Sequence, residues 1–377
     1  MIRFSKPSIG NLEERYVLDA LKSLPLSGDG KYTEMAVRFF KERLHIPHIL
    51  LTTSGTSALE MASVLLCLEP GDEVIVPSYT FSSTVNAFML RGAKPVFCDI
   101  RTDTLNLDET LIEGLITPKT KAIFTVDYAG VPCEADTILN IANKYCISVV
   151  EDAAQAVGSM YKGRPAGTLG DIGCYSFHDT KNYVMGEGGA VILNDDKLVE
   201  RAEIIREKGT NRRQLQLGLV DKYTWHDIGS SYLPSEILSA LLCAQLERFD
   251  EIMSKRMDIW NLYHKKFEEL ENNGYLSRPV IPENCLHNAH MYYLILNGYE
   301  VRNKLINYMK HSGVLAVFHY IPLHSAPMGV KLGYNASMLP KTEEYSSRLL
   351  RLPLYPDMSL GEVETVISLL YDFFNKN

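Results

Sequence analysis

The sequence has no apolar run long enough to cross a bilayer. Its longest apolar runs, such as Met61–Leu68, fall well short of the ~20 residues that a spanning helix needs. The N-terminus, MIRFSKPSIG, lacks the apolar core and the small-residue cleavage site of a secretory signal. Basic residues are in deficit, with 38 Lys+Arg against 46 Asp+Glu and a net charge of −8. This balance argues against a nucleic-acid-binding surface, so we expect no membrane and no nucleic-acid partner.

Cysteine is sparse and scattered. The seven cysteines lie far apart and include no C-x-x-C pair. Most of them sit in apolar stretches such as PVFCD and LLCAQ, which is typical of buried free thiols in a reducing compartment. His287 and His290 have a spacing seen in metal sites, but no third ligand accompanies them. We therefore expect a cytoplasmic protein with no disulfide and no bound metal.

The composition is that of a globular protein, with 46% hydrophobic and 22% charged residues in a chain of 377. After a helical N-terminal segment, short β-rich runs alternate with helical patterns between residues 48 and 195. This alternation predicts an α/β fold whose large, mostly parallel sheet is covered by helices on both faces. The predicted strands are 48–52, 73–77, 94–100, 121–128, 147–152, 172–178 and 190–195. The helical patterns between them include 56–68 and 134–145.

The pattern changes after residue 235. A long helical stretch runs from Glu236 towards Asn272, and strand patterns follow at 291–297 and 314–320. A helix from Leu360 to Phe374 closes the chain. A chain of this length holds more than one domain. We expect a large α/β domain over residues 1–250 and a smaller α+β domain over residues 251–377.

Two strand ends carry side chains suited to a phosphate and to a flat ring, and ligands of open parallel sheets bind at the carboxyl ends of the strands. After the first strand, Ser54–Ser57 open a helix whose backbone N–H groups and hydroxyls would suit a phosphate. An ordinary helix cap gives the same pattern, and no G-K-[ST] follows to make a P-loop. After the second strand come Tyr79 and Phe81, which either belong to the core or stack on a ligand ring.

An acid and a lysine follow two further strands. Glu151 and Asp152 end an almost wholly apolar strand, where a protonated ring nitrogen or a salt bridge would offset the cost of burial. Lys181 follows strand 172–178 and precedes the glycine-rich segment 186–189. It is either a solvated surface lysine or, with a lowered pKa, a lysine that forms a Schiff base. Together the four strand ends hold the parts needed to bind pyridoxal phosphate (PLP).

Over essentially its whole length the sequence resembles the DegT/DnrJ-type sugar aminotransferases. These are PLP enzymes of fold type I, with an aspartate-aminotransferase-like fold, that act on nucleotide-linked keto sugars. The segments that carry the resemblance are SGTSALEMA (54–62), GDEVIVPSYTFSST (71–84), VVEDAAQAVGS (149–159), GCYSFHDTKNY (173–183), GEGGA (186–190), REKGTNR (206–212), DIGSSYL (227–233) and FHYIPLHSAP (318–327). The resemblance implies PLP as the cofactor and a shared-site homodimer as the assembly.

The resemblance also implies roles for individual residues. Lys181 would form the Schiff base with PLP and move the proton between substrate and cofactor. Asp152 would pair with the pyridine nitrogen, Gln155 would lie near the ring, and Phe81 would stack on the face opposite Lys181. The implied phosphate ligands are Thr56, Ser57 and Ser176.

One segment departs from the family pattern. Many relatives carry G-x-N-Y-R, whose Asn reaches the phosphate of the partner subunit's site, whereas this chain has Gly229–Leu233, GSSYL. Ser231 can still donate a hydrogen bond, but Leu233 cannot replace the Arg. The candidate contacts to the sugar nucleotide are Lys208, Arg212, His319, Tyr320 and His324. The pattern of the two basic residues slightly favours a solvated helix face, and the three others are equally consistent with a turn.

The segments YTW with DIGSSYL, FHYIPLH and RLLRLPL are most similar to the subgroup that makes a 4-amino sugar for enterobacterial common antigen. The implied reaction transfers the amino group of L-glutamate to dTDP-4-keto-6-deoxy-D-glucose, giving dTDP-4-amino-4,6-dideoxy-D-galactose and 2-oxoglutarate. The product would serve a surface polysaccharide such as lipopolysaccharide or O-antigen. Alternatives are the 4-amino gluco epimer, amination at C3, a PLP-dependent sugar dehydratase and a non-catalytic regulatory relative. Lys181 argues against the dehydratase, whose relatives carry histidine there.

Overall fold

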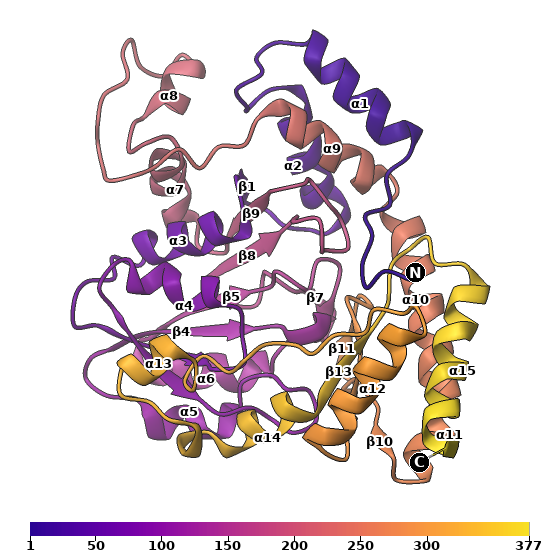
Figure 1. Ribbon diagram of the computed structural model, residues 1–377. Coiled ribbons are helices and arrows are strands. Elements are labelled where there is room, and N and C mark those ends of the chain that lie inside the picture. The colour runs from indigo at the N-terminus through magenta and orange to yellow at the C-terminus, as the bar shows by residue number, and fades with distance from the viewer. Residues whose placement is uncertain (377) are drawn as a thin grey trace.

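A seven-stranded sheet forms the centre of the computed structural model, which describes residues 1–376 (Figure 1). Its strand order is β1-β9-β8-β5-β4-β2-β3, and only β9 runs antiparallel to its neighbours. The strands are β1 (Ile49–Thr52), β2 (Glu73–Pro77), β3 (Lys94–Cys98), β4 (Thr120–Val126), β5 (Ser148–Asp152), β8 (Ile172–Ser176) and β9 (Gly189–Leu193). The predicted α/β class with a large, mostly parallel sheet is confirmed.

Helices cover both faces of this sheet, because successive side chains of a buried strand point to opposite sides. Val150 of β5 packs in the core formed with α3, α4 and α7, whereas its neighbour Val149 packs in the core formed with α5 and α6. A third core joins β1, β8 and β9 to the N-terminal helix α2 and to α9. These helices are α2 (Lys31–Arg43), α3 (Gly55–Leu65), α4 (Ser82–Met89), α5 (Glu109–Leu115), α6 (Ala135–Tyr145), α7 (Val199–Arg206) and α9 (Glu236–Glu247).

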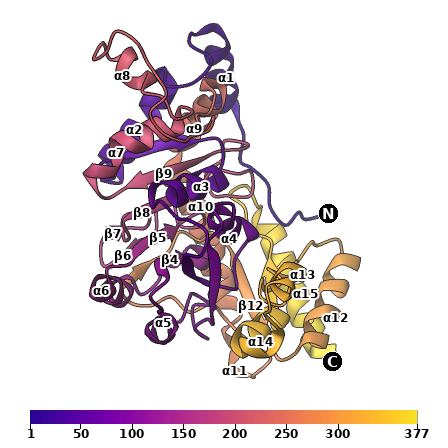
Figure 2. The ribbon, with the colours of Figure 1, turned by 90° about the vertical axis from the view of Figure 1, so that its left-hand side faces the viewer.

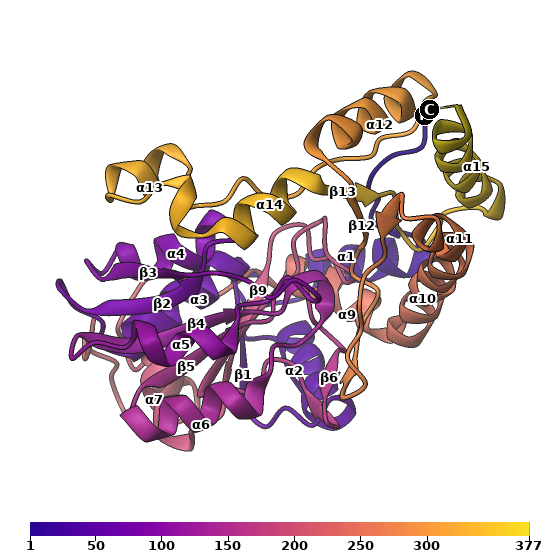
Figure 3. The same ribbon diagram turned by 90° about the horizontal axis from the view of Figure 1, so that it is seen from below.

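The C-terminal part builds a small antiparallel sheet, β10-β12-β13, backed by helices and lying to one side of the large sheet (Figure 3). Tyr292 and Leu294 of β12 face these helices, while Tyr293 and Ile295 face Tyr79, just after strand β2 of the large sheet. The elements are α10 (Phe249–Lys266), α11 (Glu268–Asn272), β10 (Leu276–Ser277), β12 (Tyr292–Leu296), α12 (Tyr299–His311), β13 (Leu349–Leu352) and α15 (Leu360–Lys376). The predicted boundary near residue 250 falls at the start of α10, and the division into two domains stays a prediction.

Shorter elements complete the chain. They are α1 (Asn11–Lys22), β6 (Met160–Tyr161), β7 (Arg164–Pro165), α8 (Arg212–Gln216), β11 (Cys285–Leu286), α13 (Pro327–Lys331) and α14 (Pro340–Arg348). β11 pairs with β6, and β6 with β7, in a second small sheet. All seven cysteines are free thiols. In the described part of the chain, no helix combines the length and the apolar character that a membrane span requires.

Two sequence predictions were wrong in detail. The predicted strand 314–320 makes only isolated bridges, from Val314 to Ile2 and from Val317 to Arg351. The place beside β12 is taken by β13, and the predicted strand ends where Tyr320 adopts a left-handed φ of 39° shortly before Pro322. The long helix predicted from Glu236 towards Asn272 is divided at Arg248 and Phe267 into α9, α10 and α11.

A buried carboxylate of α9 connects the start of the N-terminal helix α2 to a distant part of the chain. Glu236 lies at the start of α9 with 3% of its surface exposed. It accepts hydrogen bonds from the backbone N–H groups of Gly30 (3.0 Å), Tyr32 (2.7 Å) and Thr33 (3.2 Å). These groups belong to the first turn of α2, whose N–H groups have no partner within the helix. Glu236 therefore acts as the N-terminal cap of α2 from a distant part of the chain.

We predict that Glu236→Ala lowers the free energy of unfolding by about 3 kcal/mol, because buried donors lose a charged acceptor. Urea unfolding would measure the change. The control is Glu251→Ala, since Glu251 is half exposed and pairs with Arg248 and Lys255. An exposed pair of this kind contributes less than about 1 kcal/mol. Equal losses in the two variants would contradict the capping role of Glu236.

Candidate active site

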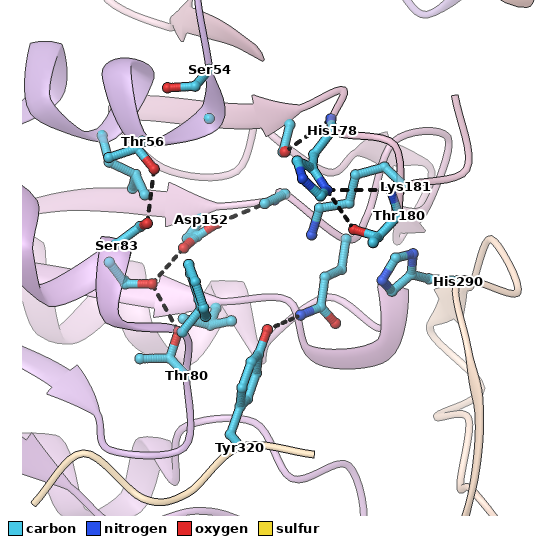
Figure 4. Close-up of a pocket in the computed structure, with 18 of the residues that line it drawn as sticks. Ser54, Thr56, Thr80, Ser83, Asp152, His178, Thr180, Lys181, His290 and Tyr320 are labelled. Atoms are coloured by element: carbon cyan, nitrogen blue, oxygen red, sulfur yellow. Dashed lines mark hydrogen bonds between the residues drawn. The ribbon is translucent and has the colours of Figure 1, made fainter. Parts of the chain in front are cut away.

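A cavity of 480 Å³ lies at the carboxyl ends of the large sheet's strands, where the C-terminal part of the chain covers them (Figure 4). Strand ends, a helix start and loops all contribute to its walls. Of the predicted site residues, those that line the cavity are Thr56, Phe81, Asp152, Gln155, Ser176, Lys181, His319 and Tyr320. The structure thus gathers side chains from sequence positions more than 200 residues apart at one sheet edge.

Asp152 lies at the end of β5 with 6% of its surface exposed. Its carboxylate accepts a hydrogen bond from the Thr84 hydroxyl at 2.7 Å and one from the Ala154 N–H at 3.2 Å. Burial raises the pKa of Asp152, while the Thr84 hydrogen bond and the charge of Lys181 act in the opposite direction. Within residues 1–376 no ion pair is seen for this carboxylate, so its charge is available to a cationic group of a ligand.

Lys181 reaches the same cavity from the loop after β8. The strands β5 and β8 are parallel neighbours, with Asp152 opposite Cys174, which brings the two loops to one edge of the sheet. Figure 4 shows the amine and the carboxylate directed into the same space. Burial lowers the pKa of Lys181 to about 8, although the charge of Asp152 raises it. About a tenth of this amine is therefore unprotonated and nucleophilic at pH 7, far more than for a surface lysine.

The start of α3 forms one wall of the cavity. Ser54 caps the helix by accepting a hydrogen bond from the Ser57 N–H at 3.0 Å, and Thr56 donates to Ser83 at 2.8 Å. A Cβ on Gly55 would come within 2.8 Å of the Ser176 Cβ, so glycine allows this close approach to β8. Free backbone N–H groups, hydroxyls and the positive end of the helix dipole together suit a phosphate.

Aromatic and amide side chains line another part of the cavity. The Phe81 ring is 59% exposed and lies 6.2 Å from the Tyr320 ring, centroid to centroid. Gln155 donates from Nε2 to the Tyr320 hydroxyl at 3.1 Å. His319 is bonded to the Tyr128 hydroxyl at 2.8 Å, and burial lowers its pKa well below the usual value. His319 is therefore neutral, and these groups offer hydrogen bonds and flat surfaces rather than charge.

Other predicted site residues lie away from this cavity. The Ser57 hydroxyl is bonded to Thr53 and Ser54 within the helix cap. His324 is fully buried, with Nδ1 2.7 Å from the Ser78 hydroxyl and Nε2 3.3 Å from Glu343. It anchors the loop that carries His319 and Tyr320 instead of lining the cavity. A residue can lie close in sequence to residues of the cavity while its own side chain points elsewhere, and the sequence does not show which direction it takes.

Three further predicted residues belong to residues 208–231, the segment around α8. This segment projects from the body of the molecule (Figure 2). Lys208 and Arg212 both lie near the Glu207 carboxylate, at 3.3 and 3.7 Å. Ser231 is exposed and forms an isolated β-bridge with Glu207. None of the three lines the cavity of its own chain.

Sequence reasoning overlooked several residues that the structure brings to the cavity. Thr84 lies inside the segment that follows β2, and its distance of 68 residues from Asp152 gave no sign of their hydrogen bond. His290 attracted notice only as a metal-ligand candidate, yet it lines the cavity and is bonded to Asn182 at 3.0 Å. Arg351 lies in the segment RLLRLPL, which was noted only for its resemblance, and Phe4 carried no local signal. Among the described residues, no group of three or more His, Cys, Asp or Glu side chains could hold a metal ion.

Comparison with known proteins gives one consistent result. A sequence profile of the DegT/DnrJ/EryC1/StrS aminotransferase family matches residues 7–371. The GDP-perosamine synthase of Escherichia coli O157:H7 is 32% identical over 371 residues, covering 98% of each chain. The spore coat polysaccharide biosynthesis protein SpsC of Bacillus subtilis is 32% identical over 377 residues, covering 98% of this chain and 96% of its own.

Solved structures agree with the sequence matches. Spr1654 of Streptococcus pneumoniae, assigned as a sugar aminotransferase, superposes in its PMP form with a TM-score of 0.92 and 28% identity, covering 100% of both chains. The PLP form of the same protein superposes with a TM-score of 0.90 at 28% identity, covering 99% of this chain and 98% of the other.

We predict that Lys181 is the most reactive lysine of the ligand-free chain near pH 8. Labelling by trinitrobenzenesulfonate, followed by peptide mass analysis across a pH series, should give it a midpoint near pH 8. Surface lysines titrate near pH ~10.4. In Asp152→Asn the midpoint should fall further, because the carboxylate charge raises the pKa of Lys181. A midpoint above that of the surface lysines would contradict the burial of the amine.

Proposed function

The chain belongs to the DegT/DnrJ/EryC1/StrS aminotransferase family, and from this premise we propose which residues act and which substrates they take. The protein is a PLP-dependent sugar aminotransferase with the α/β fold of the type I PLP enzymes. The observation that carries the assignment of roles is the meeting of Lys181 and Asp152 in one buried cavity, where neither side chain has an ion-pair partner among the described residues.

The residues of the cavity fit pyridoxal phosphate. The start of α3 and the hydroxyls of Thr56 and Ser176 would hold the phosphate. Asp152 would pair with the pyridine nitrogen, whose proton supplies the cation that this buried carboxylate lacks. Phe81 would stack on the ring, and Gln155 would lie beside it. Ser57 is bonded within the helix cap, so its role as a phosphate ligand has less support.

When bound, pyridoxal phosphate supplies a carbonyl that takes up an amine and an electron-poor ring that stabilises negative charge on the neighbouring carbon. Asp152 would keep a proton on the ring nitrogen, and its weak solvation strengthens that interaction. Lys181 would accept the proton from the substrate carbon and return it, a task suited to an amine with a pKa of about 8. Phe81 and Tyr320 would exclude water from above the reacting atoms.

As amino acceptor we propose a nucleotide-linked keto sugar, with L-glutamate as donor. The first candidate acceptor is dTDP-4-keto-6-deoxy-D-glucose, with dTDP-4-amino-4,6-dideoxy-D-galactose as the product. The segments FHYIPLH and RLLRLPL support it by their resemblance to that subgroup. A GDP-linked keto sugar is the second candidate, supported by the relative named GDP-perosamine synthase. His319 and Tyr320 are the proposed contacts to the sugar.

We further propose that the protein acts as a homodimer with shared active sites. The segment around α8 carries Lys208, Arg212 and Ser231 away from the cavity of their own chain. The same segment exposes apolar side chains, with Trp225 77% and Leu219 71% accessible. Exposed apolar groups beside polar candidates favour a protein–protein contact, so these residues would reach the cavity of the partner subunit.

A mass-resolved assay tests the substrate proposal. PLP-loaded protein and L-glutamate are incubated separately with dTDP-4-keto-6-deoxy-D-glucose and with the corresponding GDP-linked 4-keto sugar. We expect the dTDP sugar to lose its keto oxygen and gain an amine, and NMR couplings at C4 should show the galacto product. Conversion of the GDP sugar alone would replace the first candidate by the second. Failure of both, with cofactor absorbance still bleached by glutamate, would discard the proposed sugars and keep the transaminase.

We predict that Lys181→Ala folds normally and loses turnover by at least about 10³-fold, because no other amine among the described residues lines the cavity to move the proton. Steady-state kinetics would measure turnover, and thermal unfolding would verify the fold. The matched control is Lys255→Ala, which removes a surface lysine paired with Glu251 and should keep turnover within about twofold. Near-normal turnover of Lys181→Ala would overturn the role given to Lys181.

A further inference from the structure

Asp127 and Glu151 form a buried pair of carboxyl groups that the roles described so far leave unused. Asp127 follows β4 and Glu151 lies in β5, and 0% and 1% of their surfaces are exposed. The strands are parallel neighbours, with Thr125 opposite Glu151, and both acids line one small cavity. Because successive side chains of a strand face opposite sides, this cavity is separate from the one that Asp152 enters.

Each of the two carboxyl groups has one satisfied oxygen and one without a donor. Oδ1 of Asp127 accepts a hydrogen bond from the Cys133 N–H at 3.0 Å, and Oε2 of Glu151 accepts one from the Leu169 N–H at 2.9 Å. The other two oxygens, Oδ2 of Asp127 and Oε1 of Glu151, are buried and receive no donor. The two side chains are in hydrogen-bonding contact with each other. Two ionised carboxylates only accept hydrogen bonds, so this contact requires a proton on one of them.

The surroundings offer no other partner for these oxygens. Among the described residues no Lys, Arg or His lines the cavity, and its volume of about 10 Å³ is at the lower limit for a water molecule. Glu109 of α5, whose charge reaches Cys133, is paired with Arg101 at 2.6 Å. The titratable groups that sense the charge of the pair are Asp152, Cys133, Cys174, Tyr175 and Cys285. Burial raises the pKa of these thiols and of this phenol, so they stay neutral and supply no counter-charge.

Two full negative charges would be costly at this place. Burial raises the pKa of Asp127 well above its usual value, and the charge of Glu151 raises it further. Burial also raises the pKa of Glu151, although the hydrogen bonds from Asp127 and from backbone N–H groups act in the opposite direction. Adjacent acids of this kind bind and release a proton as a pair.

A short turn directly after Asp127 connects this pair to the candidate active site. Its Ala129 has a left-handed φ of 58°, which residues with a Cβ seldom adopt, so the turn needs support from its surroundings. The Ala129 N–H donates to Oε1 of Gln155 at 2.8 Å, and the Tyr128 hydroxyl is bonded to Nδ1 of His319 at 2.8 Å. Gln155 and His319 line the active-site cavity. A contact that fixes Asp127 therefore also steadies two side chains of that cavity.

We propose that Asp127 and Glu151 share one proton, held between Oδ2 and Oε1, and that this proton fastens the turn that positions Gln155 and His319. The pair then carries a single negative charge. Both acids are positioning residues, because they line a cavity of their own and act through the turn. The shared proton is independent of the proposed function, whereas its effect on the active site rests on the roles proposed there for Gln155 and His319.

The pH dependence of stability tests the shared proton. Urea unfolding at a fixed excess of PLP would be measured from about pH 6 to about pH 9 for the wild type and for Glu151→Gln, whose amide donates to Asp127 at every pH. The unfolded chain has released both carboxyl protons above pH ~5, while the folded wild type keeps one. Stability of the wild type therefore falls with rising pH relative to the variant. The ratio of their unfolding constants should rise about tenfold per pH unit until the pair ionises. A ratio that is constant over the whole range would overturn the proposal.

Two more variants complete this design. Asp127→Asn is the reciprocal amide and should give the same ratio, which keeps the test available if Glu151→Gln does not fold. The matched control is Asp108→Asn, because Asp108 is also buried. Burial raises the pKa of Asp108, but hydrogen bonds from Thr110 and Lys341 bring it below its usual value. This carboxyl is ionised in both the folded and the unfolded chain, so its ratio should not change with pH.

Infrared difference spectra give a second readout of the proton. Ordinary Asp and Glu side chains are ionised at about pH 8. At that pH the wild type should show the carbonyl stretch of a protonated carboxyl, shifted in D₂O, and both Glu151→Gln and Asp127→Asn should lack it. A wild type without this band would overturn the proposal, as would a band that persists in both variants.

Asp127→Ala, or Asp127→Ser if the first variant does not fold, tests the link to the active site. Binding of PLP, followed by its absorbance, should weaken about tenfold when the turn loses its hydrogen bond to Glu151, and by less than about twofold in Asp127→Asn. Equal affinities in the alanine and asparagine variants would overturn the positioning role. A wild-type protein that binds no PLP would instead refute the proposed roles of the cavity residues, and the unfolding ratio and the infrared band would still decide the shared proton.

Discussion

A buried carboxylate and a buried amine at one sheet edge are the constraint on which the rest of the structure depends. Asp152 is 6% exposed and ends β5, while Lys181 follows the neighbouring strand β8. Burial shifts the pKa of each towards its neutral form, upwards for the acid and downwards for the amine. Within residues 1–376, neither side chain gains a salt bridge in return. In the proposed function, pyridoxal phosphate would offset this cost by offering a ring nitrogen to the acid and a carbonyl to the amine.

The C-terminal part of the chain turns this sheet edge into an enclosed cavity. Its strand β12 is apolar on both faces, so Tyr293 and Ile295 pack against Tyr79 at the end of β2 while their neighbours pack among the C-terminal helices. That contact brings Tyr320 over the strand ends, and the buried contact between His324 and Ser78 anchors the intervening loop. The low-dielectric surroundings that perturb Lys181 are thus made by two parts of the chain.

Much of the fold could be predicted from the sequence, because each strand of the large sheet is short, apolar and bounded by turn residues. The predicted strand 314–320 was wrong because β-propensity does not say whether a partner strand is available, and β13 already occupies the edge of β12. Reactive residues directly after a strand could also be predicted, because the carboxyl ends of parallel strands meet at one edge of the sheet and ligands bind there. Ser57 and His324 lie close in sequence to residues of the cavity, but packing directs their side chains elsewhere.

The sequence by itself determined the family, the cofactor and the pair Asp152 and Lys181. Each of these follows from local sequence patterns in which a reactive residue comes directly after a strand. Only the tertiary structure decided what else meets that pair. Thr84 of α4 bonds to Asp152 at the end of β5, and Arg351 reaches the cavity from β13, which pairs with β12. Such contacts join residues far apart in the chain. They follow from how helices and sheets pack, which no local pattern encodes.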